Sequence, residues 1–88
     1  MKLFRKDPSA ILDYSIDWSL WLNGDTIATS SWTVPTGLTK VSDTKNDSST
    51  TVWLSGGTLG QTYTVTNRIT TANGRTDERS ILIKVEDR

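Results

Sequence analysis

The sequence predicts an all-β fold, a small antiparallel β-sandwich of six to seven strands. Three observations predict it. Threonine and serine together supply 25 of the 88 residues, which suits the exposed faces of strands and suits helices poorly. Apolar and polar residues alternate along several short segments, as in a strand with one buried face. Turn signals, among them two asparagine-glycine pairs, separate those segments at short intervals.

The chain is expected to divide into an N-terminal arm, residues 1–9, and a single domain, residues 10–88. Two interpretations of the arm stay open. It is a frayed terminus, because terminal residues are usually loose unless docked, or it docks on a neighbouring subunit with Phe4 as its anchor. A domain this small buries only about two-thirds of the surface that its unfolded chain exposes, so its core must be dense.

The first strand is expected between residues 10 and 22, and a second strand covers residues 25–34. A three-residue loop, 22–24, would pair Trp18 with Ala28 and bring the apolar rows of both strands to one face. The predicted inward row of the first strand is Leu12, Tyr14, Ile16, Trp18 and Leu20.

Trp21 falls outside that inward row. It either caps the end of the core or stands exposed near the Asn23-Gly24 loop as a contact residue, since tryptophan is enriched at the energetic centres of interfaces.

The middle of the chain holds weaker signals. Residues 35–37 form a turn after the second strand, because proline cannot donate to a strand ladder. A weak strand over 38–42, a polar loop over 43–49 and a short strand over 50–55 follow, and Gly56-Gly57 ends the last of these.

The strongest local prediction is a hairpin over residues 61–85. A two-residue turn at Asn73-Gly74 would place its two apolar rows on opposite faces. A three-residue loop beginning at Ala72, with Gly74 in the left-handed conformation of a β-bulge, moves the register by one residue. Tyr63 then pairs with Ile83 and Val65 with Ile81, so the apolar rows coincide.

Composition argues against catalysis and against several kinds of partner. Histidine and cysteine are absent, which removes the usual general base, the usual nucleophile pairs and any disulfide. Asp43, Asn46 and Asp47 share a loop but lack the ligand spacing of a calcium site. We therefore expect no enzyme activity, no cofactor and no metal.

The charge balance and hydropathy exclude two further classes. Ten basic and ten acidic residues cancel, so the surplus of positive charge expected of a nucleic-acid-binding protein is missing. No apolar run is long enough to cross a membrane, and the N-terminus has no signal-peptide core. The protein is expected in the cytoplasm, or released from it by lysis.

A run of mixed charge, residues 75–79, begins the last predicted strand. Two interpretations stay open. The charges protect a sheet edge from aggregation, or they form a contact surface that sets the choice of partner. The charged residues of the run are Arg75, Asp77, Glu78 and Arg79.

Residues 63–67 and 73–75 resemble the last two strands of fibronectin type III and related immunoglobulin-like domains. The resemblance implies that Tyr63 returns its hydroxyl group to the backbone a few residues upstream, near Gly60. Residues 31–35 are similar to the tryptophan-containing strand of such domains. The middle of the chain is short for a full set of strands.

A second resemblance covers almost the whole chain. The segments DPSAILDYSIDWSLWL, GDTI, SSWTV and SGGTLGQTYTVTNRITTANGRTDERSILIKV are similar to the phage fiber-tail adaptor proteins of tailed bacteriophages. The resemblance implies a non-enzymatic virion protein of the tail or connector, assembled in the host cytoplasm and present in many copies on a ring. Its partners would be other tail, connector and fiber proteins.

The candidate contact residues are those expected on the arm, beside the first turn and along the charged run. They are Phe4, Arg5, Trp21, Arg75, Asp77, Glu78 and Arg79. The alternative function is that of a carbohydrate-binding or adhesion module, with Trp21 or Trp53 as a platform on which a sugar stacks.

Overall fold

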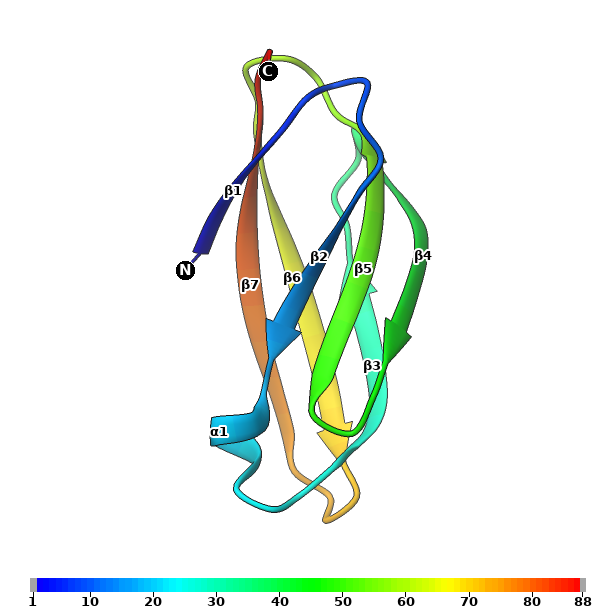
Figure 1. Ribbon diagram of the computed structural model, residues 1–88, viewed down its shortest axis with the longest axis vertical. Helices are drawn as coiled ribbons and strands as arrows, with labels where there is room; N and C mark the ends of the chain where they lie inside the picture. Colours follow the sequence, from blue (N-terminus) through cyan, green and yellow to red (C-terminus); the bar gives the residue numbers. More distant parts are fainter. Residues whose placement is uncertain (1, 88) are drawn as a thin grey trace.

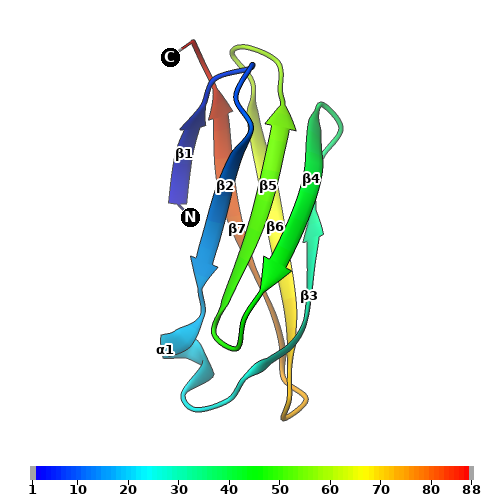
Figure 2. The ribbon, with the colours of Figure 1, turned by 45° about the vertical axis from the view of Figure 1, so that its right-hand side comes forward.

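The computed structural model describes residues 2–87 as an elongated sandwich of two sheets, which confirms the predicted all-β fold. The strand order is β1-β7-β6-β3 in one sheet and β2-β5-β4 in the other (Figures 1 and 2). The elements are β1 (Lys2–Lys6), β2 (Leu12–Asp17), α1 (Ser19–Leu22), β3 (Ile27–Thr33), β4 (Leu38–Lys45), β5 (Ser49–Gly56), β6 (Thr62–Thr71) and β7 (Thr76–Val85).

The segment expected to be an arm is a strand of the sandwich. β1 pairs with β7 in parallel, from Lys2 beside Ile81 to Lys6 beside Val85, so the sandwich is not wholly antiparallel. Lys6 is 0% exposed, and its ammonium group donates to the carbonyl oxygen of Gly56 at 2.7 Å. These contacts dock β1 on its own chain, which corrects the expectation of a loose terminus.

The predicted hairpin over residues 61–85 is confirmed in both register and turn. Tyr63 lies opposite Ile83 and Val65 opposite Ile81. The loop is closed by a hydrogen bond from the Thr71 N–H to the Arg75 carbonyl oxygen at 2.8 Å, and Gly74 has a φ of 90°. A positive φ favours glycine because a Cβ atom would strain the backbone there.

The Tyr63 side chain behaves as the resemblance to immunoglobulin-like domains implied. Its hydroxyl oxygen accepts a hydrogen bond from the Thr58 N–H at 3.0 Å, and hydrogen bonds from the Thr58 side chain and backbone lower the pKa of Tyr63. Tyr63 thereby ties the loop before β6 to the start of that strand.

The predicted first hairpin is wrong. β2 pairs with β5 and β3 pairs with β6, so the two strands lie in opposite sheets. Trp18 therefore does not face Ala28 across a ladder. A β-bulge between Ile27 and Thr29 also changes the inward position at the start of β3, so Ile27 is buried while Ala28, the predicted partner of Trp18, is exposed. An inward apolar row looks the same in sequence whether its strand packs beside another strand or across the core.

The expected first strand ends at Asp17, and residues Ser19–Leu22 form the helical turn α1. Asn23 and Gly24 follow it with φ values of 47° and 91°. They end a helix rather than close a hairpin, since asparagine and glycine with positive φ are also the usual residues at helix C-termini. Leu20, expected in the core, is 96% exposed.

The middle of the chain is more regular than its composition suggested. β4 extends to Lys45, through part of the predicted polar loop, and pairs with β5. A tight turn joins them, in which the Asn46 side-chain oxygen accepts hydrogen bonds from the Ser48 and Ser49 N–H groups at 2.9 and 2.8 Å.

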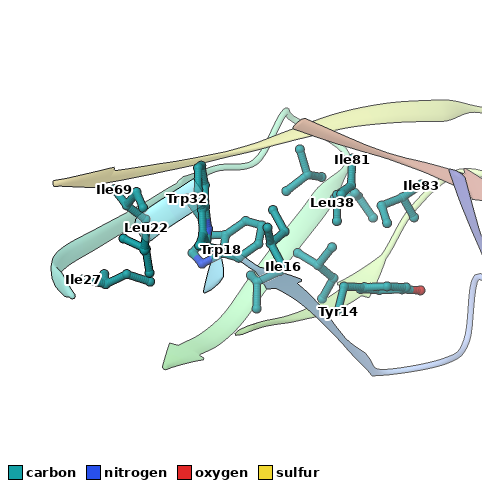
Figure 3. Packing of buried hydrophobic residues seen from close by; sticks show 13 residues of the cluster. Tyr14, Ile16, Trp18, Leu22, Ile27, Trp32, Leu38, Ile69, Ile81 and Ile83 are labelled. Atoms are coloured by element: carbon teal, nitrogen blue, oxygen red, sulfur yellow. The ribbon is translucent and has the colours of Figure 1, made fainter. Parts of the chain in front are cut away.

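The core fills the space between the two sheets. Figure 3 shows Leu22, Ile27 and Ile69 at one end and Trp18 and Trp32 in the middle, with other apolar side chains continuing toward the opposite end. Within residues 2–87 no helix has the length and apolar character required to cross a membrane.

Candidate partner-binding surface

Two arginines of the predicted charged run hold α1 in place. The Arg75 guanidinium lies 4.3 Å from the centre of the Trp21 ring, and the Arg79 guanidinium lies 4.3 Å from the Trp18 ring. The Trp18 and Trp21 rings meet edge to face at 5.5 Å. We call these two stacked pairs the arginine clamp, and the clamp together with Ser19–Leu22 the α1 corner. Cation–π contacts of this kind stabilise by about 0.5–2 kcal/mol each, depending on burial.

Arg75 also bonds the chain on both sides of Asn23-Gly24. It donates to the Leu22 carbonyl oxygen at 2.8 Å and forms an ion pair with Asp25 at 3.3 Å. The Asp25 side chain is 3% exposed. Hydrogen bonds from the Thr71 side chain, then from Thr26, Arg75 and Asn73, lower the pKa of Asp25. The carboxylate therefore joins the segment after α1 to the β6–β7 loop.

Arg79, within β7, also holds α1 in place. It donates to the Asp17 carbonyl oxygen at 3.1 Å while stacking on the buried Trp18 ring. Hydrogen bonds from the Ser19 backbone and side chain, with a smaller contribution from the Arg79 charge, lower the pKa of Asp17. The carboxylate thus caps the first turn of α1.

The two acidic residues of the run have separate surroundings. The Asp77 carboxylate accepts a hydrogen bond from the neighbouring Glu78 N–H at 2.8 Å. The exposed Glu78 side chain lies 4.0 Å from Arg68 on the outer face of the sheet. At this distance and exposure such a pair contributes about 0–1 kcal/mol, so Glu78 is available for other contacts.

Phe4 and Arg5 lie apart from the α1 corner. Phe4 pairs with Ile83 in the register and packs against Tyr14, with ring centres 4.9 Å apart. Arg5 forms an ion pair with Glu86 at 2.9 Å near the C-terminus. The structure therefore brings Trp21, Arg75 and Arg79 together at one end of the sandwich and leaves Phe4 and Arg5 nearer the other end (Figure 1).

Sequence reasoning missed Leu20. Its place in the alternating row predicted burial, but the row ends at Trp18 because the backbone turns helical at Ser19. The available signal was the run Leu20-Trp21-Leu22, whose three consecutive large apolar residues fit no alternation and precede a helix-ending Asn-Gly pair.

A second exposed aromatic residue lies on the three-stranded sheet. Trp53 is 40% exposed, because Val52 and Leu54 take the inward positions on β5. It lies opposite Asp13 of β2 on one side and Ser42 of β4 on the other. Its ring therefore stands on an outer face with a carboxylate and a hydroxyl group beside it.

The described part of the chain, residues 2–87, contains no group of three or more acidic, histidine or cysteine side chains placed to hold a metal ion.

Comparison with models of protein families gives a match over most of the chain. The family model described as podophage GP4 fiber-tail adaptor protein gp77 matches residues 6–84 of the 88-residue chain. The match begins at the last residue of β1 and ends one residue before the end of β7. The comparison with curated proteins gives no significant match.

Proposed function

Because this chain belongs to the podophage GP4 fiber-tail adaptor protein family, we propose that it joins the phage tail or its connector to fibers and neighbouring tail proteins. The observation that carries the proposal is the match over residues 6–84, which includes nearly the whole sandwich. The family is a structural component of the virion tail. In this role the sandwich is a rigid spacer, present in many copies on a ring and added during assembly in the host cytoplasm.

The α1 corner is the contact that we assign to a neighbouring tail or fiber protein. Leu20 projects from it with 96% of its surface exposed. The arginine clamp fixes the turn that carries Leu20, so little conformational entropy is lost when a partner binds it. A rigid, protruding apolar side chain suits insertion into a pocket of the partner, surrounded by the polar groups of the corner.

This assignment changes the expected roles of the candidate residues. Arg75 and Arg79 hold the corner from within, so reversing their charge would damage the fold as well as any interface. Trp21, the neighbour of Leu20 in α1, remains a proposed contact, and Asp77 and Glu78 remain proposed contacts on β7. Phe4 and Arg5 are proposed only for a second contact near the other end of the molecule.

The experiment replaces Leu20 by aspartate and measures both folding and incorporation into phage particles. The Leu20→Asp variant is expected to keep the wild-type unfolding free energy within about 0.5 kcal/mol, because the side chain is exposed. It is expected to be lost from purified particles, because a buried, unpaired carboxylate opposes docking.

The matched control is Leu59→Asp. Leu59 is 58% exposed in the loop before β6, at the opposite end of the sandwich from α1 (Figure 1). This variant is expected to enter particles normally. Normal incorporation of Leu20→Asp would remove the α1 corner from the interface, and absence of the wild-type chain from tails would contradict the adaptor role itself.

The exposure of Trp53 favours carbohydrate binding as a second candidate function. A tryptophan ring beside Asp13 and Ser42 offers an apolar face to a sugar ring and polar groups to its hydroxyls. Titration with glycans should shift the tryptophan fluorescence of the wild type and leave that of Trp53→Phe unchanged. A glycan response that survives in Trp53→Phe, or no response in the wild type, contradicts this function.

A further inference from the structure

Among the described residues 2–87, half of β7 has no paired strand on the side of β1. β1 pairs only with Ile81–Val85, whereas β7 begins at Thr76. Figures 1 and 2 show β1 starting partway along β7, which continues past it toward α1. We call Thr76–Ser80 the free edge; among residues 2–87 it pairs with β6 alone.

The hydrogen bonds of the flanking residues show which backbone groups point outward there. The Val85 N–H donates to Gln61 and the Thr71 N–H to Arg75, so odd-numbered residues of β7 face β6. The Glu86 N–H donates to Lys6, so even-numbered residues face the side of β1. By this alternation the backbone N–H and C=O groups of Thr76 and Glu78 point sideways in the plane of the sheet, away from β6. An added strand would bond to them there.

A hollow of about 590 Å³ adjoins the end of the free edge nearest β1, where Arg79 and Ser80 line it. It opens between the two sheets, with β2 on one side, β7 on the other and the first described residue of β1 at its end. Two nearly buried apolar side chains, Ile16 and Ile81, belong to its lining. A strand added beside the free edge would place alternate side chains in this hollow.

The charges around the hollow favour an acidic occupant. Lys2 and Arg79 line it together with one carboxylate, that of Asp17. The Asp17 carboxylate is already bonded to the Ser19 N–H at 2.9 Å, with the Ser19 side chain adding a second hydrogen bond. Arg79 is stacked on Trp18 and Lys2 lies 5.3 Å from the centre of the Phe4 ring, but neither cation is neutralised by these contacts. The hollow is thus lined by two positive charges and one negative charge, which complements a carboxylate on an incoming chain.

The edge strands β4 and β3 are interrupted by bulges, whereas the edge strand β2, like β7, pairs without a register shift. β4 has a bulge between Lys40 and Ser42 and an inward row of charged residues, and β3 has the bulge after Ile27. The β6–β7 register runs without a shift. Only side-chain charge covers the free edge, chiefly the Asp77 carboxylate that accepts the Glu78 N–H in place of a strand carbonyl.

From this geometry we propose that the free edge binds an extended segment of a partner protein as an added β-strand. The segment continues the line of β1, bonds to the backbone of Thr76 and Glu78, and places an acidic side chain in the hollow near Lys2 and Arg79. Main-chain hydrogen bonds supply affinity in this mode and alternate side chains supply selectivity. The inference deepens the adaptor role, which it presupposes, by naming the chemistry of one partner.

The test uses the purified full chain and a capped peptide, acetyl-Thr-Ile-Thr-Glu-Thr-Thr-amide, followed by NMR of the backbone amides. A dissociation constant of about 1 mM is expected, because a short flexible peptide loses much entropy on binding. Shifts are expected at Thr76–Ser80 and at Ser15–Asp17 across the hollow. A peptide with lysine in place of glutamate should bind at least about fivefold more weakly.

Three variants of the chain are expected to weaken peptide binding, to leave it unchanged and to strengthen it. Lys2→Glu should weaken binding about fivefold by reversing a charge that lines the hollow, whereas Lys84→Glu makes the same change on an outward position of β7 and should not. Asp77→Ala should strengthen binding about threefold, because it frees the Glu78 N–H and removes a negative charge.

Four outcomes overturn the proposal: no shifts, shifts away from the free edge, equal binding of the two peptides, or equal effects of the two lysine variants. Dimerisation of the chain through Thr76–Ser80 without peptide also overturns it, because the occupant is then a second copy. None of these results bears on incorporation of the chain into particles, so failure here is distinguishable from failure of the adaptor role.

Discussion

Asn67 joins the two sheets through a single buried amide. Its side-chain oxygen accepts from the Trp18 ring N–H at 3.0 Å and from the Thr50 hydroxyl at 2.7 Å. Its amide nitrogen donates to the Ser30 hydroxyl and to the Ser31 carbonyl oxygen, each at 2.9 Å. Because the amide is fully buried and every hydrogen-bonding position is used, it fixes how the sheets face each other.

Replacing Asn67 by alanine is expected to lower the unfolding free energy by about 3 kcal/mol or more, because several buried polar groups lose their partner at once. Urea denaturation measures the change. Ser15→Ala removes a hydroxyl pair that is exposed and should cost no more than about 0.5 kcal/mol. A loss at Asn67 as small as the loss at Ser15 would refute the assigned role.

Two glycines with positive φ differ in the space around them, so replacing each by alanine distinguishes the cost of backbone strain from the cost of a steric clash. Gly74 has a φ of 90° and open space around the position of a Cβ atom. Gly37 has a φ of 108°, and a Cβ atom there would lie 2.8 Å from the Tyr63 hydroxyl oxygen.

Gly74→Ala should therefore destabilise the fold by about 1 kcal/mol, the cost of the conformation alone. Gly37→Ala should cost about 1–3 kcal/mol more, because it also displaces Tyr63 from the Thr58 N–H. Thermal unfolding of both variants gives the comparison. Equal losses would mean that Tyr63 moves aside without consequence.

At the scale of elements, α1 connects the two sheets. The chain leaves β2 in one sheet and enters β3 in the other, and the turn between them is held by contacts with β7 and with the β6–β7 loop. The Asp25 carboxylate lies at the centre of these contacts. The Asn23-Gly24 pair ends a helix here because Arg75 of the β6–β7 loop and Arg79 of β7, both more than fifty residues away in the sequence, hold α1 in place.

The lowered pKa of Asp25 predicts how stability depends on pH. A carboxylate whose pKa is lower in the folded state stabilises the fold above its unfolded pKa of about 3.9, and this contribution is lost as pH falls through the folded pKa. The difference in unfolding free energy between wild type and Asp25→Asn should be full near neutral pH and shrink in acid. Urea denaturation of both proteins between about pH 2 and pH 7 measures it. A difference that stays constant into acid would contradict the assignment.

At the scale of the whole molecule, β1 forms one edge of the four-stranded sheet, beside the hollow. The sandwich as a whole is long in one direction. Its principal extents are 41 × 21 × 18 Å, with the α1 corner at one end and the loop before β6 at the other (Figure 1). This shape suits the proposed spacer role, with contacts at the two ends, and on the proposed ring of copies repeated weak contacts would add through multivalency.

Docking of β1 on its own chain has a direct test. Phe4 is half-buried against Tyr14, whereas Leu3 lies on the outer side of the same strand and is exposed. Phe4→Ala should lower the unfolding free energy of the isolated chain by about 1–3 kcal/mol, and Leu3→Ala should change it little. Equal stability of wild type and Phe4→Ala would mean that Phe4 contributes only to contacts with other molecules.

The sequence by itself determined the all-β class, the position of most strands and the register of the β6–β7 hairpin. That register followed from local information, since two apolar rows and one turn share the same short stretch and only one alignment buries both rows. The sequence also indicates Trp21, Arg75 and Arg79 as candidate contact residues, but it does not indicate that they stack on one another.

Tertiary structure alone decided which strands are neighbours, where β1 docks and which side chains remain exposed. The row of β2 was compatible with a partner in its own sheet or across the core, and the Asn23-Gly24 pair was compatible with a hairpin or a helix end. The exposure of Leu20 depends on the helix end at Asn23-Gly24, and the free edge of β7 depends on where β1 pairs. The physical reason is that alternation and positive φ are properties of a few consecutive residues, whereas strand pairing and burial are settled by contacts between residues distant in the chain.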